Sequence, residues 1–145
     1  MKRRLSSGVS GTVFGAVAIL FAGCATQTSH QFAEPARDWE TRSGQLLYRT
    51  ATTTLIGEVL VRFSKTGNFE LTFSKGPGMA LFQLRQDDSF AEVRGALARS
   101  GWSGPADRAP APLRPWLELR DKLRHAPQQK TVRHVSGPDT FVFRF

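Results

Sequence analysis

The stretch that decides the fold is NFELTFSKGPGMALFQL, residues 68–84. Apolar residues alternate with polar ones over 69–74, which is the period of a strand with one buried face. A Lys-Gly-Pro-Gly loop follows at 75–78, where Gly supplies unusual backbone angles and Pro interrupts a strand ladder. The alternation then resumes over 79–86. The stretch therefore predicts two antiparallel strands joined by a tight loop.

The same period of two extends outward from this hairpin, from Gly44 to about Ala98. Short turns rich in Gly, Asn and Asp separate the apolar runs, as in an antiparallel meander. Together with the central hairpin, the strands that we expect here are 45–52, 55–63, 69–74, 79–86 and 90–97.

The C-terminal part changes period. Residues 99–112 are rich in Gly and Pro and are predicted to be a loop. Residues 113–125 have apolar positions three and four apart, which predicts an amphipathic helix with Pro115 in its first turn. Residues 130–135 and 140–145 then form a last hairpin. The fold class is thus mainly β with one helix (α+β), a curved antiparallel meander of about seven strands. One helix is too short to cover such a sheet, so the sheet must curl or hold something apolar.

The N-terminus is typical of an export signal. Three basic residues at 2–4 precede an apolar run at 13–22, which is too short for a comfortable transmembrane helix and fits the core of a signal peptide. Residues 20–24, Leu-Phe-Ala-Gly-Cys, resemble a bacterial lipobox. The resemblance implies that Cys24 becomes the first mature residue and carries lipid, including palmitate. The alternative is that these residues are not a lipobox, in which case Cys24 is an ordinary residue of a signal peptide that is removed.

These features predict three regions: a lipoprotein signal peptide at 1–23, a lipidated Cys and tether at 24–43, and a sheet domain at 44–145. Cleavage lowers the formal net charge from +8 to +5, because it removes three basic residues and no acids. Ala25, where inner-membrane retention favours Asp, indicates the periplasmic face of the outer membrane. In the tether, residues 38–40 are expected to open a short helical turn.

Catalytic and metal-binding patterns are missing. His30, His125 and His134 lack the spacing of metal ligands, and Ser103 lacks a nucleophile-elbow pattern. The adjacent Asp87 and Asp88 fit a solvated turn better than a catalytic carboxylate pair. We therefore expect neither an enzyme nor a cofactor or metal site.

The positive charge does not indicate nucleic-acid binding. Arginines are scattered over every expected element instead of lining one face with stacking aromatic residues. On an exported lipoprotein such charge fits anionic headgroups or the acidic surface of an envelope protein.

Residues 68–84 and the sequence Leu-Arg-Pro-Trp-Leu at 113–117 resemble the LolB family of outer-membrane lipoprotein receptors. The resemblance implies an open half-barrel with a helical lid and an apolar cavity. It also implies a cavity that receives lipoprotein acyl chains from a periplasmic carrier protein. The membrane-transfer loop of that family corresponds to Gly76, Pro77, Gly78 and Met79.

The leading hypothesis is therefore a lipid-anchored protein that binds an apolar ligand, such as lipoprotein acyl chains, during outer-membrane lipoprotein localisation. The ligand face is expected to comprise Leu55, Val59, Val61, Phe63, Phe69, Leu71, Phe73, Phe82, Leu84, Trp116, Leu117 and Leu123. The same residues are also what a plain hydrophobic core requires. The alternative is a structural adaptor that docks on an envelope complex through an edge strand or the 101–112 loop. An elongated apolar pocket between sheet and helix favours the carrier, and a filled interior favours the adaptor.

Overall fold

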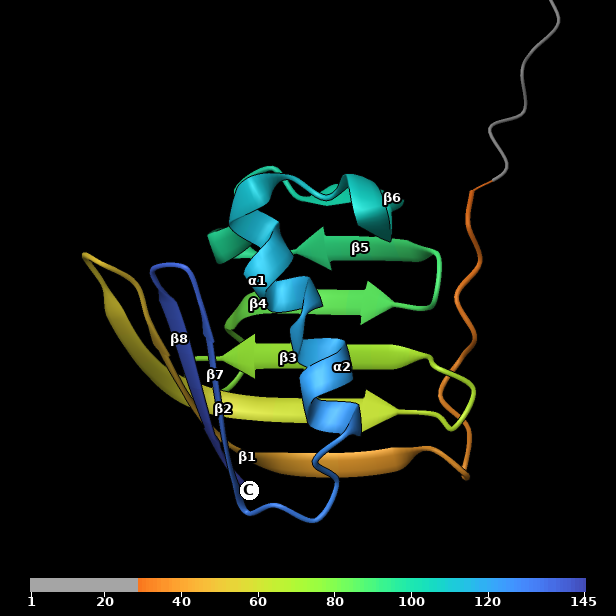
Figure 1. Cartoon of the computed structure of the whole chain (residues 1–145), viewed down its shortest axis with the longest axis horizontal. Helices are drawn as coiled ribbons and strands as arrows, with labels where there is room; N and C mark the ends of the chain where they lie inside the picture. Colours follow the sequence, from red (N-terminus) through yellow and green to blue (C-terminus); the bar gives the residue numbers. More distant parts are fainter. Residues whose placement is uncertain (1–28) are drawn as a thin grey trace, which may run out of the picture.

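The computed structural model describes residues 29–145, which form one curved antiparallel sheet with a helical segment across its concave face (Figure 1). Within these residues the strands are β1 (Glu40–Arg49), β2 (Thr54–Phe63), β3 (Phe69–Ser74), β4 (Ala80–Gln86), β5 (Phe90–Arg94), β6 (Trp102–Pro105), β7 (Thr131–Ser136) and β8 (Asp139–Arg144). The helices are α1 (Arg114–Leu117) and α2 (Leu119–Arg124), preceded by short 3₁₀ turns η1 (Ala96–Ala98), η2 (Ala106–Arg108) and η3 (Ala111–Leu113). The predicted fold class is confirmed.

The sheet order is β6-β5-β4-β3-β2-β1-β8-β7. Strands β1 to β6 follow one another as a meander, and the C-terminal hairpin adds to the free side of β1. Register brings the apolar positions into rows, with Phe73 opposite Phe82 and Leu71 opposite Leu84. One face of every central strand is therefore apolar, and that face carries the core.

The described part of the sheet stays open, with β6 and β7 as its edges (Figure 1). Two glycines lie where backbones come unusually close. A Cβ built on Gly44 would lie 2.0 Å from the carbonyl oxygen of Arg144, and one on Gly57 would lie 2.1 Å from that of Ser74. Only Gly permits such an approach between neighbouring strands, so these positions let the sheet bend between β3 and β8.

Several boundaries differ from the prediction, among them those of the strand expected at 45–52, which is β1 at Glu40–Arg49. The expected helical turn at 38–40 is wrong, because Trp39 closes a turn by donating its N–H to the carbonyl of Ala36 (3.0 Å) and β1 begins at Glu40. The expected 99–112 loop contains β6, which pairs with β5. Strand β5 ends at Arg94 because Gly95 has a φ of +108°.

The predicted helix at 113–125 is present as two pieces that join at Glu118. The chain bends there without losing its hydrogen bonds, since the N–H of Glu118 donates to Arg114 (3.1 Å) and its carbonyl accepts from Lys122 (3.2 Å). Pro115 lies in the first turn of α1, as expected.

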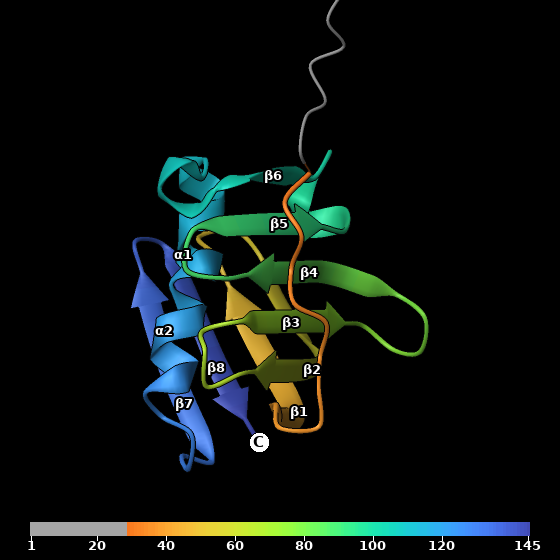
Figure 2. The ribbon, with the colours of Figure 1, turned by 90° about the vertical axis from the view of Figure 1, so that its right-hand side faces the viewer.

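The predicted signal peptide and Cys24 lie outside the described residues. Among residues 29–145, no helix is both long and apolar enough to cross a membrane. Residues 29–39, inside the region expected to be a tether, run as an extended segment across strands of the sheet (Figure 2).

Candidate functional site

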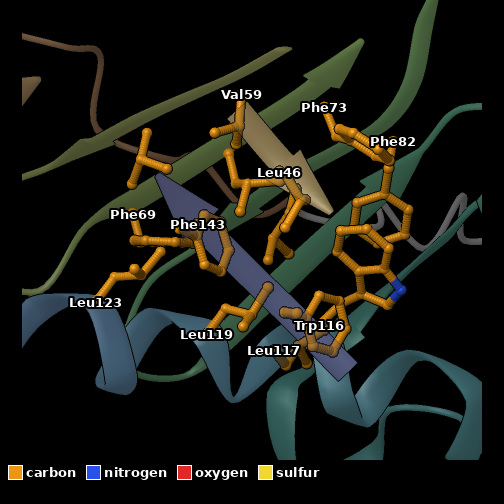
Figure 3. Close-up of a cluster of buried hydrophobic side chains, with 14 of the residues drawn as sticks. Leu46, Val59, Phe69, Phe73, Phe82, Trp116, Leu117, Leu119, Leu123 and Phe143 are labelled. Atoms are coloured by element: carbon orange, nitrogen blue, oxygen red, sulfur yellow. The ribbon is translucent and has the colours of Figure 1, made fainter. Parts of the chain in front are cut away.

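The layer between the sheet and the helical segment is the predicted ligand face. Its members come from β2, β3, β4, α1 and α2, and the structure brings all twelve predicted residues to this side. Eleven of them are buried, and Leu55 is half-buried at the margin of the cluster. Figure 3 shows side chains of the sheet and of the helical segment meeting in a single layer.

An aromatic group organises one end of this layer. The Trp116 indole stacks on the Phe82 ring, with centroids 3.9 Å apart and planes inclined by 20°. It meets the ring of Phe141 edge-on at 4.9 Å and that of Tyr48 at 4.8 Å. Aromatic pairs in such arrangements add to the free energy of burial, so Trp116 is the main apolar anchor of α1.

The sequence prediction missed the contribution of β1, β8 and Leu119 to the same layer. Leu46, Phe141, Phe143 and Leu119 are fully buried, and Tyr48 is nearly so. The alternating phenylalanines of the last hairpin signalled a packed face. That β8 lies beside β1 is a long-range pairing, which no local pattern shows.

Side chains fill this interior in the observed conformation, so the described residues show the filled interior that favours the adaptor and not the elongated apolar pocket that favours the carrier. The hollows described for residues 29–145 lie elsewhere: a polar groove of about 810 Å³ and one of about 500 Å³ are lined mainly by outward-facing residues. Trp116 and the leucines of α2 occupy the space that an acyl chain would need (Figure 3). An acyl chain can therefore enter only if the helical segment moves.

Polar contacts attach the helical segment at its rim. The Arg120 side chain is buried, and its Nε donates to the carbonyl of Gly67 (2.8 Å) in the β2–β3 turn. The same guanidinium pairs with Asp88 in the β4–β5 turn. At the opposite side, Glu118 accepts from His134 Nε2 of β7 (2.8 Å). Since Asp88 and Glu118 are largely exposed, water competes for both pairs.

The predicted transfer loop projects beyond the sheet between β3 and β4 (Figure 2). Gly76 and Gly78 have φ angles of +73° and +76°, and a Cβ on either would meet nothing within 4 Å. The Met79 side chain is 58% exposed, the largest exposed fraction among the described large apolar residues. The loop, closed by the hydrogen bond from the Lys75 N–H to the Met79 carbonyl (3.1 Å), thus presents an apolar side chain to the surroundings.

The residues considered for catalysis have separate structural partners. Asp88 binds Arg120, and Asp87 accepts the N–H groups of Ser89 and Phe90, both at 2.9 Å. His30 Nε2 lies 2.5 Å from Asp87 Oδ2. Among residues 29–145, no three His, Cys, Asp or Glu side chains are arranged to hold a metal ion.

Two carboxyl groups depart from their ordinary pKa in opposite directions. Burial alone would raise the pKa of Asp87, but the hydrogen bonds from Ser89, His30 and Phe90 outweigh it and lower the pKa. Burial raises the pKa of Asp139, although the Tyr48 hydroxyl, 3.5 Å away, partly offsets this. Burial and the charge of Asp139 raise the pKa of Tyr48.

No protein-family model and no curated protein sequence matches the chain.

Proposed function

We propose that this chain is a lipid-anchored envelope protein that binds an apolar ligand, namely a lipoprotein acyl chain, at the periplasmic face of the outer membrane. The observation that supports it most is the cover of the concave face. An amphipathic helical segment closes an open, aromatic-lined sheet and is attached at its rim by one buried hydrogen bond from Arg120 and by two ion pairs for which water competes.

Binding exchanges one apolar occupant for another. Burying the four large side chains of the helical segment, Trp116, Leu117, Leu119 and Leu123, stabilises the closed form by about 1.5–3 kcal/mol each. A palmitoyl chain that buries about fourteen methylenes returns about 0.8 kcal/mol for each. The two totals are similar, so an acyl chain that arrives from water can displace the helical segment without a large net cost.

The β3–β4 loop supports the membrane side of the proposal. In the resembled family a protruding apolar residue lies at the position of Pro77, and here the exposed Met79 lies two residues further along the chain. Lys75 in the same loop suits anionic headgroups. The cargo would pass from a periplasmic carrier protein to the sheet and then to the membrane.

Saturable binding of a fluorescent fatty acid to residues 25–145 tests the proposal. Arg120→Ala frees the rim of the helical segment, so we expect faster probe binding than in the unaltered chain. Lys122→Ala is the matched control, because Lys122 is exposed on the same helix. A folded sample without saturable binding refutes the ligand-binding function.

The filled interior favours a second candidate, a structural adaptor without a small ligand. Such a protein would dock through an edge of the sheet, β6 or β7, or through the 101–112 segment. Two results together support this candidate. The protein does not bind the fatty acid, and an envelope protein co-purifies with the unaltered chain but not with the Val135→Arg variant, which alters β7.

A further inference from the structure

Residues 30–35, which we call the strap, bind to the sheet instead of forming a free tether. The strap crosses the face opposite the helical segment, near the β2–β3 and β4–β5 turns (Figure 2). The His30 ring stacks on Phe90, with centroids 4.4 Å apart and planes inclined by 14°. The Arg85 guanidinium lies over the Phe32 ring at 5.1 Å and also pairs with Glu34 at 3.2 Å.

The groups of the sheet that bind the strap are oriented by contacts within the sheet itself. The β4–β5 turn fixes the Asp87 carboxylate through the N–H groups of Ser89 and Phe90, so its second oxygen is positioned for His30. Glu70 of β3 forms an ion pair with Arg85, with 3.2 Å between Glu70 Oε1 and Arg85 Nε. Both strap partners are therefore oriented by contacts within the sheet.

The described contacts of the strap with the sheet run through side chains. Its backbone adds no strand to the sheet, and Glu34 is 84% exposed. The exposed Arg85–Glu34 pair and a few aromatic contacts are weak and reversible, whereas the His30–Asp87 pair is part-buried, with side chains 26% and 21% exposed. The polar groove of about 810 Å³ beside the strap leaves it open to water. The strap is thus docked in a way that permits release.

We propose that the strap is a releasable latch that sets how far the sheet domain extends from its membrane anchor; this rests on the proposed lipidation of Cys24. With the strap docked, the chain from Cys24 to His30 spans about six residue-to-residue steps, a maximum reach of roughly 20 Å. With the strap released, the chain from Cys24 to Glu40 spans about sixteen steps, a maximum reach of roughly 55 Å.

The Met79 loop makes this difference matter. The strap docks where β4 ends, and the loop lies where β4 begins, seven residues or about 23 Å away. With a reach of roughly 20 Å, the docked form brings the loop to the leaflet unless the strands stand nearly upright, at more than about 60° to the membrane plane. Release lets the loop meet the membrane in any orientation. The latch therefore limits the orientations in which the transfer loop can meet the membrane.

Docking is tested by measuring the distance between two nitroxide labels in the full chain in detergent. The labels are attached at Gln31→Cys and Lys65→Cys, two exposed positions. Cys24→Ser removes the other cysteine. We expect one narrow distance distribution. His30→Ala combined with Phe32→Ala, both in the strap, should broaden and lengthen it, and Ala36→Ser should not. A broad distribution in the unaltered strap, or no change in the double variant, overturns the docking.

Reach is tested in vesicles with the lipidated full chain, labelled with a fluorophore at Met79→Cys and quenched by nitroxide lipids. The double variant should increase quenching, and Ala36→Ser should leave it unchanged. Equal quenching in all forms, with radioactive palmitate present on Cys24, overturns the latch alone. Absence of palmitate on Cys24 refutes the anchor, and therefore the proposed localisation and the reach argument together.

Discussion

Trp116 holds the helical segment to the sheet more than any other residue. Its indole is 2% exposed and touches rings from β1, β4 and β8. Trp116→Ala should lower the free energy of unfolding by about 3–5 kcal/mol, because it removes these contacts and leaves a cavity. Urea unfolding followed by circular dichroism measures the loss. Val135→Ala, at an exposed site, should change little; a comparable loss there would contradict the assignment.

Asp87 and Asp139 should give stability opposite dependences on pH. The lowered pKa of Asp87 means that its contribution is present above the unfolded-state pKa and is lost as pH falls through the folded-state pKa. The raised pKa of Asp139 means that its contribution is present below the unfolded-state pKa and is lost as pH rises through the folded-state pKa.

Thus Asp87→Asn should lower the free energy of unfolding at pH 7. The effect of Asp139→Asn on the free energy of unfolding should be more stabilising at pH 7 than in acid. The changes in the free energy of unfolding that the two substitutions cause should both become smaller towards about pH 3, where the carboxyl groups of the unfolded chain are protonated. Urea midpoints measured between acid and neutral pH provide the test. Two differences of the same sign at neutral pH would contradict it.

At the scale of elements, Arg120 couples α2 to two turns of the sheet. Arg120→Ala leaves the Gly67 carbonyl without its donor and Asp88 without its partner, a loss of about 1–3 kcal/mol. Hydrogen exchange of the 119–124 amides should accelerate more than that of β3. Lys122→Ala should leave both rates unchanged. Equal acceleration in α2 and β3 would mean that Arg120 stabilises the whole domain and not the attachment of the helix.

Local periodicity accounts for the elements that the sequence predicted. Strands β2 to β5 and the β7–β8 hairpin carry apolar residues at alternate positions between turn residues, which is sufficient to locate them. Strand β6 has four residues, two of which are Gly104 and Pro105, and only its pairing with β5 makes it a strand. The start of β1 at Glu40 is polar on both faces and depends likewise on its pairing with β2.

The candidate site divides in the same way. Its apolar members followed from periodicity, because alternation selects the face of each strand. The attachments of the cover did not, because Arg120 meets residues 53 and 32 positions away in the sequence. The strap was expected to be free for a similar reason: His30 and Phe32 acquire their partners only when β4 and β5 are in place.

At the scale of the whole molecule, curvature depends on the two strand glycines. Gly44 lies beside the end of β8, the antiparallel neighbour of β1, and a methyl group there would overlap the Arg144 carbonyl. Gly44→Ala should therefore separate β1 from the C-terminal hairpin, which carries Phe141 and Phe143 into the core. Because this exposes one side of the aromatic layer, we expect a large loss of stability, beyond about 3 kcal/mol.

Gly76→Ala is the control: its φ of +73° adds local strain, but its Cβ meets no neighbour, so the fold should survive. Thermal unfolding of the two variants measures the difference, and a Gly44→Ala protein as stable as the Gly76→Ala protein would show that the close approach of β1 and β8 is not what curves the sheet.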